Sequence, residues 1–80
     1  MPYVNKGVRE SLDQGRKPLV PGELNYVISQ IVRSYLAMRG ESYTIFNDIA
    51  GVLVCLQMEL YRRKTALYED QKMSESGDVF

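Results

Sequence analysis

The spacing of hydrophobic residues predicts two helices. From residue 21 onward, apolar residues recur at intervals of three and four, which places them on one face of an α-helix. In the first segment, about 21–39, these residues are Leu24, Val27, Ile28, Ile31, Val32, Tyr35 and Leu36. In the second segment, about 43–72, they are Ile45, Ile49, Val52, Leu53, Leu56, Leu60 and Leu67. The pattern therefore predicts an all-α fold.

The ends of both helices carry recognisable signals. Pro21 suits the first position of a helix, where its missing N–H needs no partner, and Glu23 complements the positive end of the helix dipole. Gly40 suits a left-handed C-terminal cap, and Ser42 can cap the start of the second helix. Because the connection is so short, we expect an antiparallel two-helix hairpin.

The two ends of the chain differ from this helical middle. Residues 1–20 are interrupted by prolines and glycines at positions 2, 7, 15 and 18. We expect an irregular N-terminal arm there, with at most one or two helical turns between Val8 and Asp13. The arm either lies across the helical core or is a mobile leader. The predicted organisation is an arm at 1–20, a helical hairpin at 21–73 and a C-terminal tail at 74–80.

The middle of the second helix predicts self-association. Between Ile49 and Leu60 the chain is apolar nearly all round, which is typical of a helix buried on more than one side. A single hairpin provides one covering helix, so we expect a homo-oligomer in the form of a helical bundle. The expected oligomer interface consists of Ile49, Gly51, Val52, Val54, Cys55 and Leu56.

The amino-acid composition excludes several kinds of binding partner and indicates the cellular compartment. Ten basic and ten acidic residues give zero formal charge, without the excess that binding to nucleic-acid phosphates requires, so nucleic acid is not an expected partner. Cys55 is the single cysteine and histidine is absent, so neither an internal disulfide, a Cys/His metal site nor a cofactor is expected. No apolar run approaches the roughly 20 residues of a membrane span. We expect a soluble, cytoplasmic protein.

No residue pattern indicates catalysis. Glu23, Asp48 and Glu59 are potential acids or bases, but no pair of them is held together by spacing. A phosphate-binding loop and a metal-binding motif are both missing from the sequence. We therefore expect that the protein is not an enzyme.

Two sets of residues are candidates for ligand binding. Asn25 and Tyr26 lie beside the start of the first helix, where free N–H groups favour anions. The alternative is structural: Asn25 bonds the arm or another subunit, and Tyr26 packs at the rim of the core.

The second set combines groups that bind phosphates and bases, because arginine binds phosphate in a bidentate manner and tyrosine stacks on bases. It consists of Tyr61, Arg62, Arg63 and Tyr68. The alternative is a solvated charged surface with a Glu59–Arg63 ion pair. In an antiparallel hairpin, this set would lie at the same end as Asn25 and Tyr26, and the two sets could line one pocket.

The stretches that carry a resemblance to known proteins are Pro21-Gly22-Glu23-Leu24-Asn25-Tyr26, Arg39-Gly40, Tyr43, Gly51-Val52-Leu53, Glu59, Tyr61-Arg62-Arg63, Tyr68-Glu69 and Gly77-Asp78-Val79. The Gly-Glu-Leu-Asn-Tyr run at 22–26 is the most specific of them. Through these stretches the chain resembles a family of small, functionally uncharacterised proteins of tailed bacteriophages and prophages. Val20 stands where such proteins often have threonine, and Phe80 where tyrosine is usual. The resemblance implies a phage origin and a bacterial host cytoplasm, but no activity.

Three functions of different class are compatible with these features. The first is a phage accessory protein, a self-associating binding module that sequesters a nucleotide-like immune signal of the host and so acts against host defence. The second is an inhibitor or adaptor that binds a host protein. The third is a structural or assembly protein of the virion.

Overall fold

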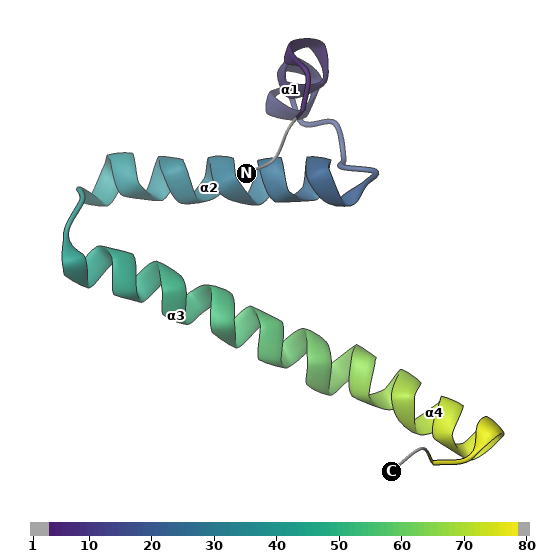
Figure 1. The fold of residues 1–80 in the computed structure, drawn as a ribbon. Helices are drawn as coiled ribbons and strands as arrows, with labels where there is room; N and C mark the ends of the chain where they lie inside the picture. The colour runs from purple at the N-terminus through teal and green to yellow at the C-terminus, as the bar shows by residue number, and fades with distance from the viewer. Residues whose placement is uncertain (1–3, 79–80) are drawn as a thin grey trace. The chain divides into compact units, whose positions relative to one another are not determined.

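The chain is helical throughout its regular structure (Figure 1). The structure, a computed structural model, describes residues 4–78. Within this range it contains helices and no strand, which confirms the predicted all-α class. The elements are α1 (Lys6–Asp13), α2 (Pro21–Arg39), α3 (Tyr43–Leu60), the π-helical turn η1 (Tyr61–Thr65) and α4 (Ala66–Ser76).

The chain divides into two compact units, residues 1–45 and residues 46–80. The first unit contains α1 and α2, and the second contains nearly all of α3 together with η1 and α4. The antiparallel hairpin and its assembly into a bundle stay predictions.

Residues 1–20 are not irregular throughout, because α1 occupies Lys6–Asp13. Its first turn is capped by Asn5, whose side-chain oxygen accepts a hydrogen bond from the Val8 N–H at 2.9 Å. This cap starts the helix at Lys6, two residues before the predicted turns. After α1 the chain turns at Gly15, whose φ of 103° favours glycine.

The bounds of α2 coincide with the range that the hydrophobic pattern predicts. Its N-cap residue, Val20, provides no side-chain cap, and Pro21 follows at the first helical position. Instead, the Glu23 carboxylate reaches back and accepts a hydrogen bond from the Leu19 N–H at 3.0 Å. The helix ends before Gly40, whose φ of 85° suits a C-terminal cap.

A small core holds α1 against α2. Among the residues described, Leu12 and Tyr26 are the buried ones, with 6% and 9% of their surface exposed. The Tyr26 hydroxyl donates to the Asp13 carboxylate, with distances of 3.0 and 3.2 Å to its two oxygens. We call this contact region between the two helices, formed by residues 11–26, the α1–α2 corner. The burial of Leu12 and the Tyr26–Asp13 hydrogen bond both anchor α1 on α2.

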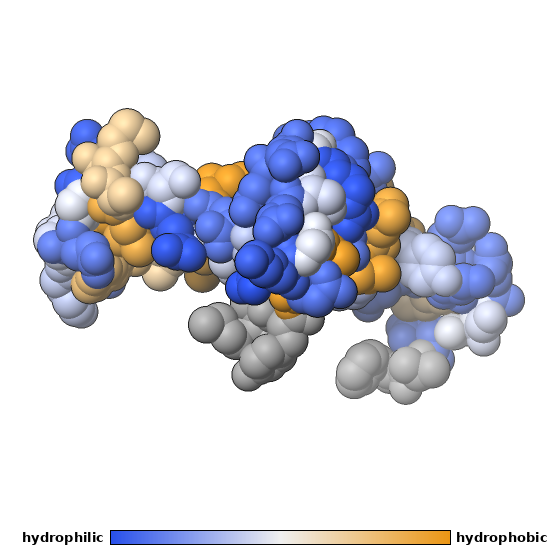
Figure 2. All heavy atoms as spheres, turned by 90° about the horizontal axis from the view of Figure 1, so that it is seen from above, coloured by the Kyte–Doolittle hydropathy of each residue, from blue (hydrophilic) through white to orange (hydrophobic). Residues whose placement is uncertain are grey.

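The second unit is one long helix without a core of its own. Ser42 caps its start by accepting a hydrogen bond from the Ile45 N–H at 3.2 Å, as the sequence predicts. The helix passes the predicted end near Lys72 and stops before Gly77, whose φ is 87°. No residue of α3, η1 or α4 is buried, and hydrophobic side chains lie at the molecular surface in Figure 2.

Within residues 4–78, no helix combines the length and the mean hydropathy that crossing a bilayer requires.

The buried leucine of α1 offers a test of the corner. We expect Leu12→Ala to weaken the docking of α1 on α2 by about 2 kcal/mol, since a buried leucine loses packing without any loss of helix propensity. Amide hydrogen exchange of the α1 residues, measured by NMR, should accelerate. Glu10→Ala, at an exposed position of the same helix, is the control and should leave exchange nearly unchanged. Unchanged exchange in Leu12→Ala would contradict the proposed anchoring.

Candidate functional site

An ion pair and several hydrogen bonds stabilise the α1–α2 corner. Arg16 forms an ion pair with Glu23, with 3.3 Å between Nη2 and Oε1. The Arg16 Nε donates to the Ser11 hydroxyl at 3.0 Å, and this hydroxyl donates to the Val8 carbonyl at 2.9 Å. Because Glu23 also accepts the Leu19 N–H at 3.0 Å, its carboxylate fixes the connection between the two helices at two points.

The protonation states of Glu23 and Tyr26 follow from these contacts. The hydrogen bond from the Leu19 N–H lowers the pKa of Glu23 below its ordinary value; desolvation opposes this effect and Arg16 adds to it. Burial raises the pKa of the Tyr26 phenol, and the hydrogen bond to Asp13 together with its charge raises it further. At neutral pH Glu23 is therefore a carboxylate and Tyr26 a neutral donor.

Asn25 and Tyr26 have different surroundings although they are adjacent in sequence. The Tyr26 ring is buried at the corner, and its hydroxyl bonds the arm through Asp13. Asn25 is exposed, and its Oδ1 accepts a hydrogen bond from the Ser29 hydroxyl at 3.1 Å within the same helix. The bond to the arm thus comes from Tyr26, whereas the sequence suggested Asn25 for that role. A ligand-binding role for either residue stays a prediction.

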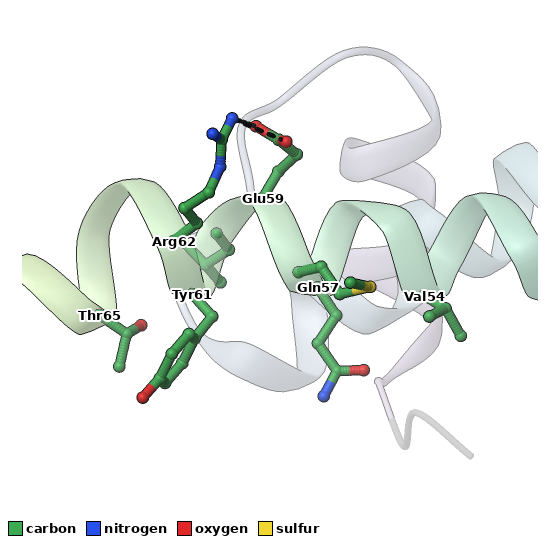
Figure 3. A pocket seen from close by; sticks show the side chains of 8 residues that line it. Val54, Gln57, Glu59, Tyr61, Arg62 and Thr65 are labelled. Carbon is green, nitrogen blue, oxygen red and sulfur yellow. Dashed lines mark hydrogen bonds and ion pairs between the residues drawn. The ribbon is translucent and has the colours of Figure 1, made fainter.

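One acidic side chain, Glu59, forms ion pairs with two arginines of the basic segment of η1. Arg63 Nε donates to Glu59 Oε2 at 2.6 Å, which confirms the predicted ion pair. Arg62 Nη2 contacts Glu59 Oε1 at 3.2 Å as well (Figure 3). About 70% of each arginine side chain is exposed, so these pairs contribute little to stability and weaken with salt. The two guanidinium groups share one carboxylate and keep a net positive charge.

The π-helical turn is a feature that the sequence does not signal. The Ala66 N–H donates to the Tyr61 carbonyl, five residues earlier, whereas an α-helix bonds four residues earlier. Such turns are rare and occur frequently at functional sites. The extra residue rotates the following side chains by about 100° relative to an uninterrupted helix. Leu67 therefore does not continue the apolar stripe of α3 as the uninterrupted pattern predicts.

A shallow hollow lies along the junction of α3 and η1. In Figure 3, Gln57, Tyr61 and Thr65 project from one side of the helix, and the Glu59–Arg62 pair projects from another. The full lining consists of Val54, Gln57, Met58, Glu59, Leu60, Tyr61, Arg62 and Thr65. Of the predicted ligand residues, Tyr61 and Arg62 line the hollow, and their side chains project from different sides of the helix (Figure 3).

The remaining predicted residues of this unit lie outside the hollow. Arg63 is bound to Glu59, and Tyr68 lies on α4, where the Lys72 ammonium is 5.5 Å from the centre of its ring. Because Asn25 and Tyr26 belong to the other unit, a pocket shared by both sets stays a prediction.

The predicted interface residues are mostly accessible in the single chain. Ile49 is half-buried, and Gly51 and Cys55 are exposed. Val52, Val54 and Leu56 expose 59%, 52% and 62% of their surface. The contacts that would cover these side chains are therefore not made by α3 itself.

Comparison with known proteins places the chain in a family. A family model for a domain of unknown function, DUF6899, matches residues 1–79. The chain belongs to the DUF6899 family. The match includes both the α1–α2 corner and the η1 segment, so both are parts of the family's domain. No curated protein and no solved structure is significantly similar to the chain.

The Glu23 carboxylate predicts a pH dependence of the corner. Since the pKa of Glu23 is lowered on folding, its stabilising contribution is present above the ordinary value of 4.5 and is lost as the pH falls through the lower folded pKa. We expect the Leu19 amide proton resonance in NMR spectra to shift with a midpoint below 4.5. Glu23→Gln should abolish this titration. A midpoint at or above the ordinary value would show that the Leu19–Glu23 bond does not form.

Proposed function

We propose that the protein is a non-catalytic, self-associating helical module. In this proposal α2 covers one face of α3 as an antiparallel hairpin, and other copies of the chain cover the opposite face. The supporting observation is the helix of α3, η1 and α4, which has no buried residue and carries large exposed apolar side chains. The most exposed of those in α3 from residue 52 onward, all above 50%, are Val52, Val54, Leu56, Met58 and Leu60.

The positions of these side chains require more than one covering helix. At about 100° per residue, Ile49, Leu53 and Leu56 fall on one face of α3, and Val54 and Met58 fall on the opposite face. One neighbouring helix covers a stripe roughly 100° wide. Since α2 is the one other long helix in the described part of the chain, a second molecule is needed for the opposite face.

Energetics favour assembly over an exposed helix. Isolated helices are marginal in water, and most helical stability in proteins comes from packing of an apolar face. Each large apolar side chain that becomes fully buried contributes roughly 1.5–3 kcal/mol. Several such side chains per copy are required, because association costs roughly 4–15 kcal/mol in lost translational and rotational freedom.

Self-association can be tested at Val54 and Gly51. We expect the purified protein to sediment as an oligomer and Val54→Asp to shift it to a smaller species, because a buried carboxylate is strongly unfavourable. Val54→Ala is the matched control and should remain assembled. A Cβ at Gly51 meets no atom of its own chain within 4 Å, so loss of assembly in Gly51→Leu would report contacts between copies. A parent protein that is a folded monomer at all concentrations would refute the proposal.

A second candidate is binding of a phosphate-bearing small molecule at η1. It is supported by the two largely exposed guanidinium groups of Arg62 and Arg63, which lie in a π-helical turn that also carries Tyr61. A phosphate would displace Glu59 from at least one arginine, with Tyr61 available to stack on a base. The resemblance to phage proteins supports a narrower form, in which the ligand is a nucleotide-like immune signal of the host and the protein acts in the host cytoplasm. In that form Asn25, Tyr26 and Tyr68 complete the site.

The ligand proposal is tested by releasing bound molecules. Denaturation of the purified protein should liberate a nucleotide that mass spectrometry detects. Arg62→Ala combined with Arg63→Ala should weaken its binding by roughly tenfold or more per guanidinium group. Arg33→Ala with Arg39→Ala, on α2, is the charge-matched control. If no molecule is released and a host protein is captured in a pull-down, the result would favour the inhibitor or adaptor function. Presence of the protein in purified virions would favour a structural role.

A further inference from the structure

One side of the long helix carries exposed apolar side chains, with small ones towards its N-terminal end and a bulky one towards its C-terminal end. This side, which we call the hollow face, is formed by Ala50, Val54, Gln57, Met58, Tyr61 and Thr65, of which all but Ala50 line the hollow. Val54, Met58 and Tyr61 expose 52%, 64% and 54% of their surface. The centre of this face lies roughly 120° around the helix from the stripe of Ile49, Leu53 and Leu56, so most of the face stays accessible to another molecule when that stripe is covered.

We propose that the hollow face packs against the hollow face of a second copy, antiparallel, about a two-fold axis near Gln57 and Met58. This inference rests on the self-association proposed above and names the surface and the orientation. In a two-fold interface, residue i of one copy meets residue j of the other, and the reverse holds as well. With the axis at this position, Tyr61 meets Val54 of the second copy, and Thr65 meets Ala50.

The sizes of the side chains fit this arrangement. The bulky Tyr61 lies on one side of the axis, and the smaller Ala50 and Val54 lie on the other. A two-fold rotation therefore places the Tyr61 ring of each copy over the smaller Val54 of the other, which allows the two helices to pack closely there. Gly51 lies at the edge of the same face, and its own chain leaves open space where a side chain would be. Close approach of a second helix accounts for a glycine that otherwise costs about 1 kcal/mol in a helix interior.

The distribution of charge favours the antiparallel orientation. Residues 49–58 carry no charged side chain, whereas Arg62, Arg63 and Lys64 follow in succession. A parallel pair would set the two basic segments side by side, where like charges repel. An antiparallel pair sets each basic segment beside the uncharged segment of the other copy and opposes the two helix dipoles. The same self-complementarity favours a second copy of this chain over an unrelated partner.

Cysteine pairing across the interface tests the orientation and the face together. In a Cys55→Ser background, which removes the single native thiol, one chain carries Ala50→Cys and another carries Thr65→Cys. After mixing and mild oxidation, we expect the mixed disulfide to be the main cross-linked product. Each variant alone should cross-link poorly, because an antiparallel pair holds identical positions about 22 Å apart along the axis. Mass spectrometry distinguishes the three products.

A matched control shows whether cross-linking depends on this face or only on the two chains being close together. Asp48→Cys replaces Ala50→Cys in the same experiment; it lies two residues away but on a different side of the helix, and it should not pair with Thr65→Cys. Homodimers of Ala50→Cys as the main product would show a parallel pair and overturn the inference. An oligomer by sedimentation without the mixed disulfide would overturn the inference while leaving self-association intact. A monomer would overturn both.

Discussion

The uncovered apolar surface of the helix from Tyr43 to Ser76 is the constraint on which the rest of the structure depends. A helix in water keeps its form when one face is buried, and this helix buries none of its residues within its own unit. Its apolar side chains lie on opposite faces, so a single neighbour is insufficient. In the self-association proposed above, other copies of the chain cover the remaining face.

The first unit is stabilised differently, by a few specific contacts. Leu12 provides the apolar contact, Tyr26 and Asp13 a hydrogen bond, and Arg16 and Glu23 an ion pair. Glu23 and Tyr26 belong to the Gly-Glu-Leu-Asn-Tyr run, so the most specific motif of the sequence has a structural role at the corner. Within the same run, the Asn25 side chain accepts a hydrogen bond from Ser29 of its own helix and remains accessible.

Local rules predict much of the fold and little of the candidate site. Pro21, Gly40 and Ser42 act through their own backbone geometry or short-range hydrogen bonds, so the sequence predicts the helix ends near them. The Glu59–Arg63 pair is predictable for the same reason, since its partners are one turn apart. The Tyr26–Asp13 bond depends on how α1 docks on α2, which no spacing encodes. The π-helical turn at Tyr61–Thr65 has ordinary helix-forming residues and no sequence signal.

The contacts that form α1 and the α1–α2 corner join residues close together in the sequence, so they can form early while the chain is being synthesised. The Asn5 cap, the Arg16–Glu23 ion pair and the Tyr26–Asp13 bond all join residues within positions 5–26. Domains form from the N-terminus as the chain leaves the ribosome, and local contacts form fastest. The corner can therefore be complete before the apolar helix emerges. Because the apolar helix follows the corner in the chain, it spends less time without its covering partners than it would if it came first.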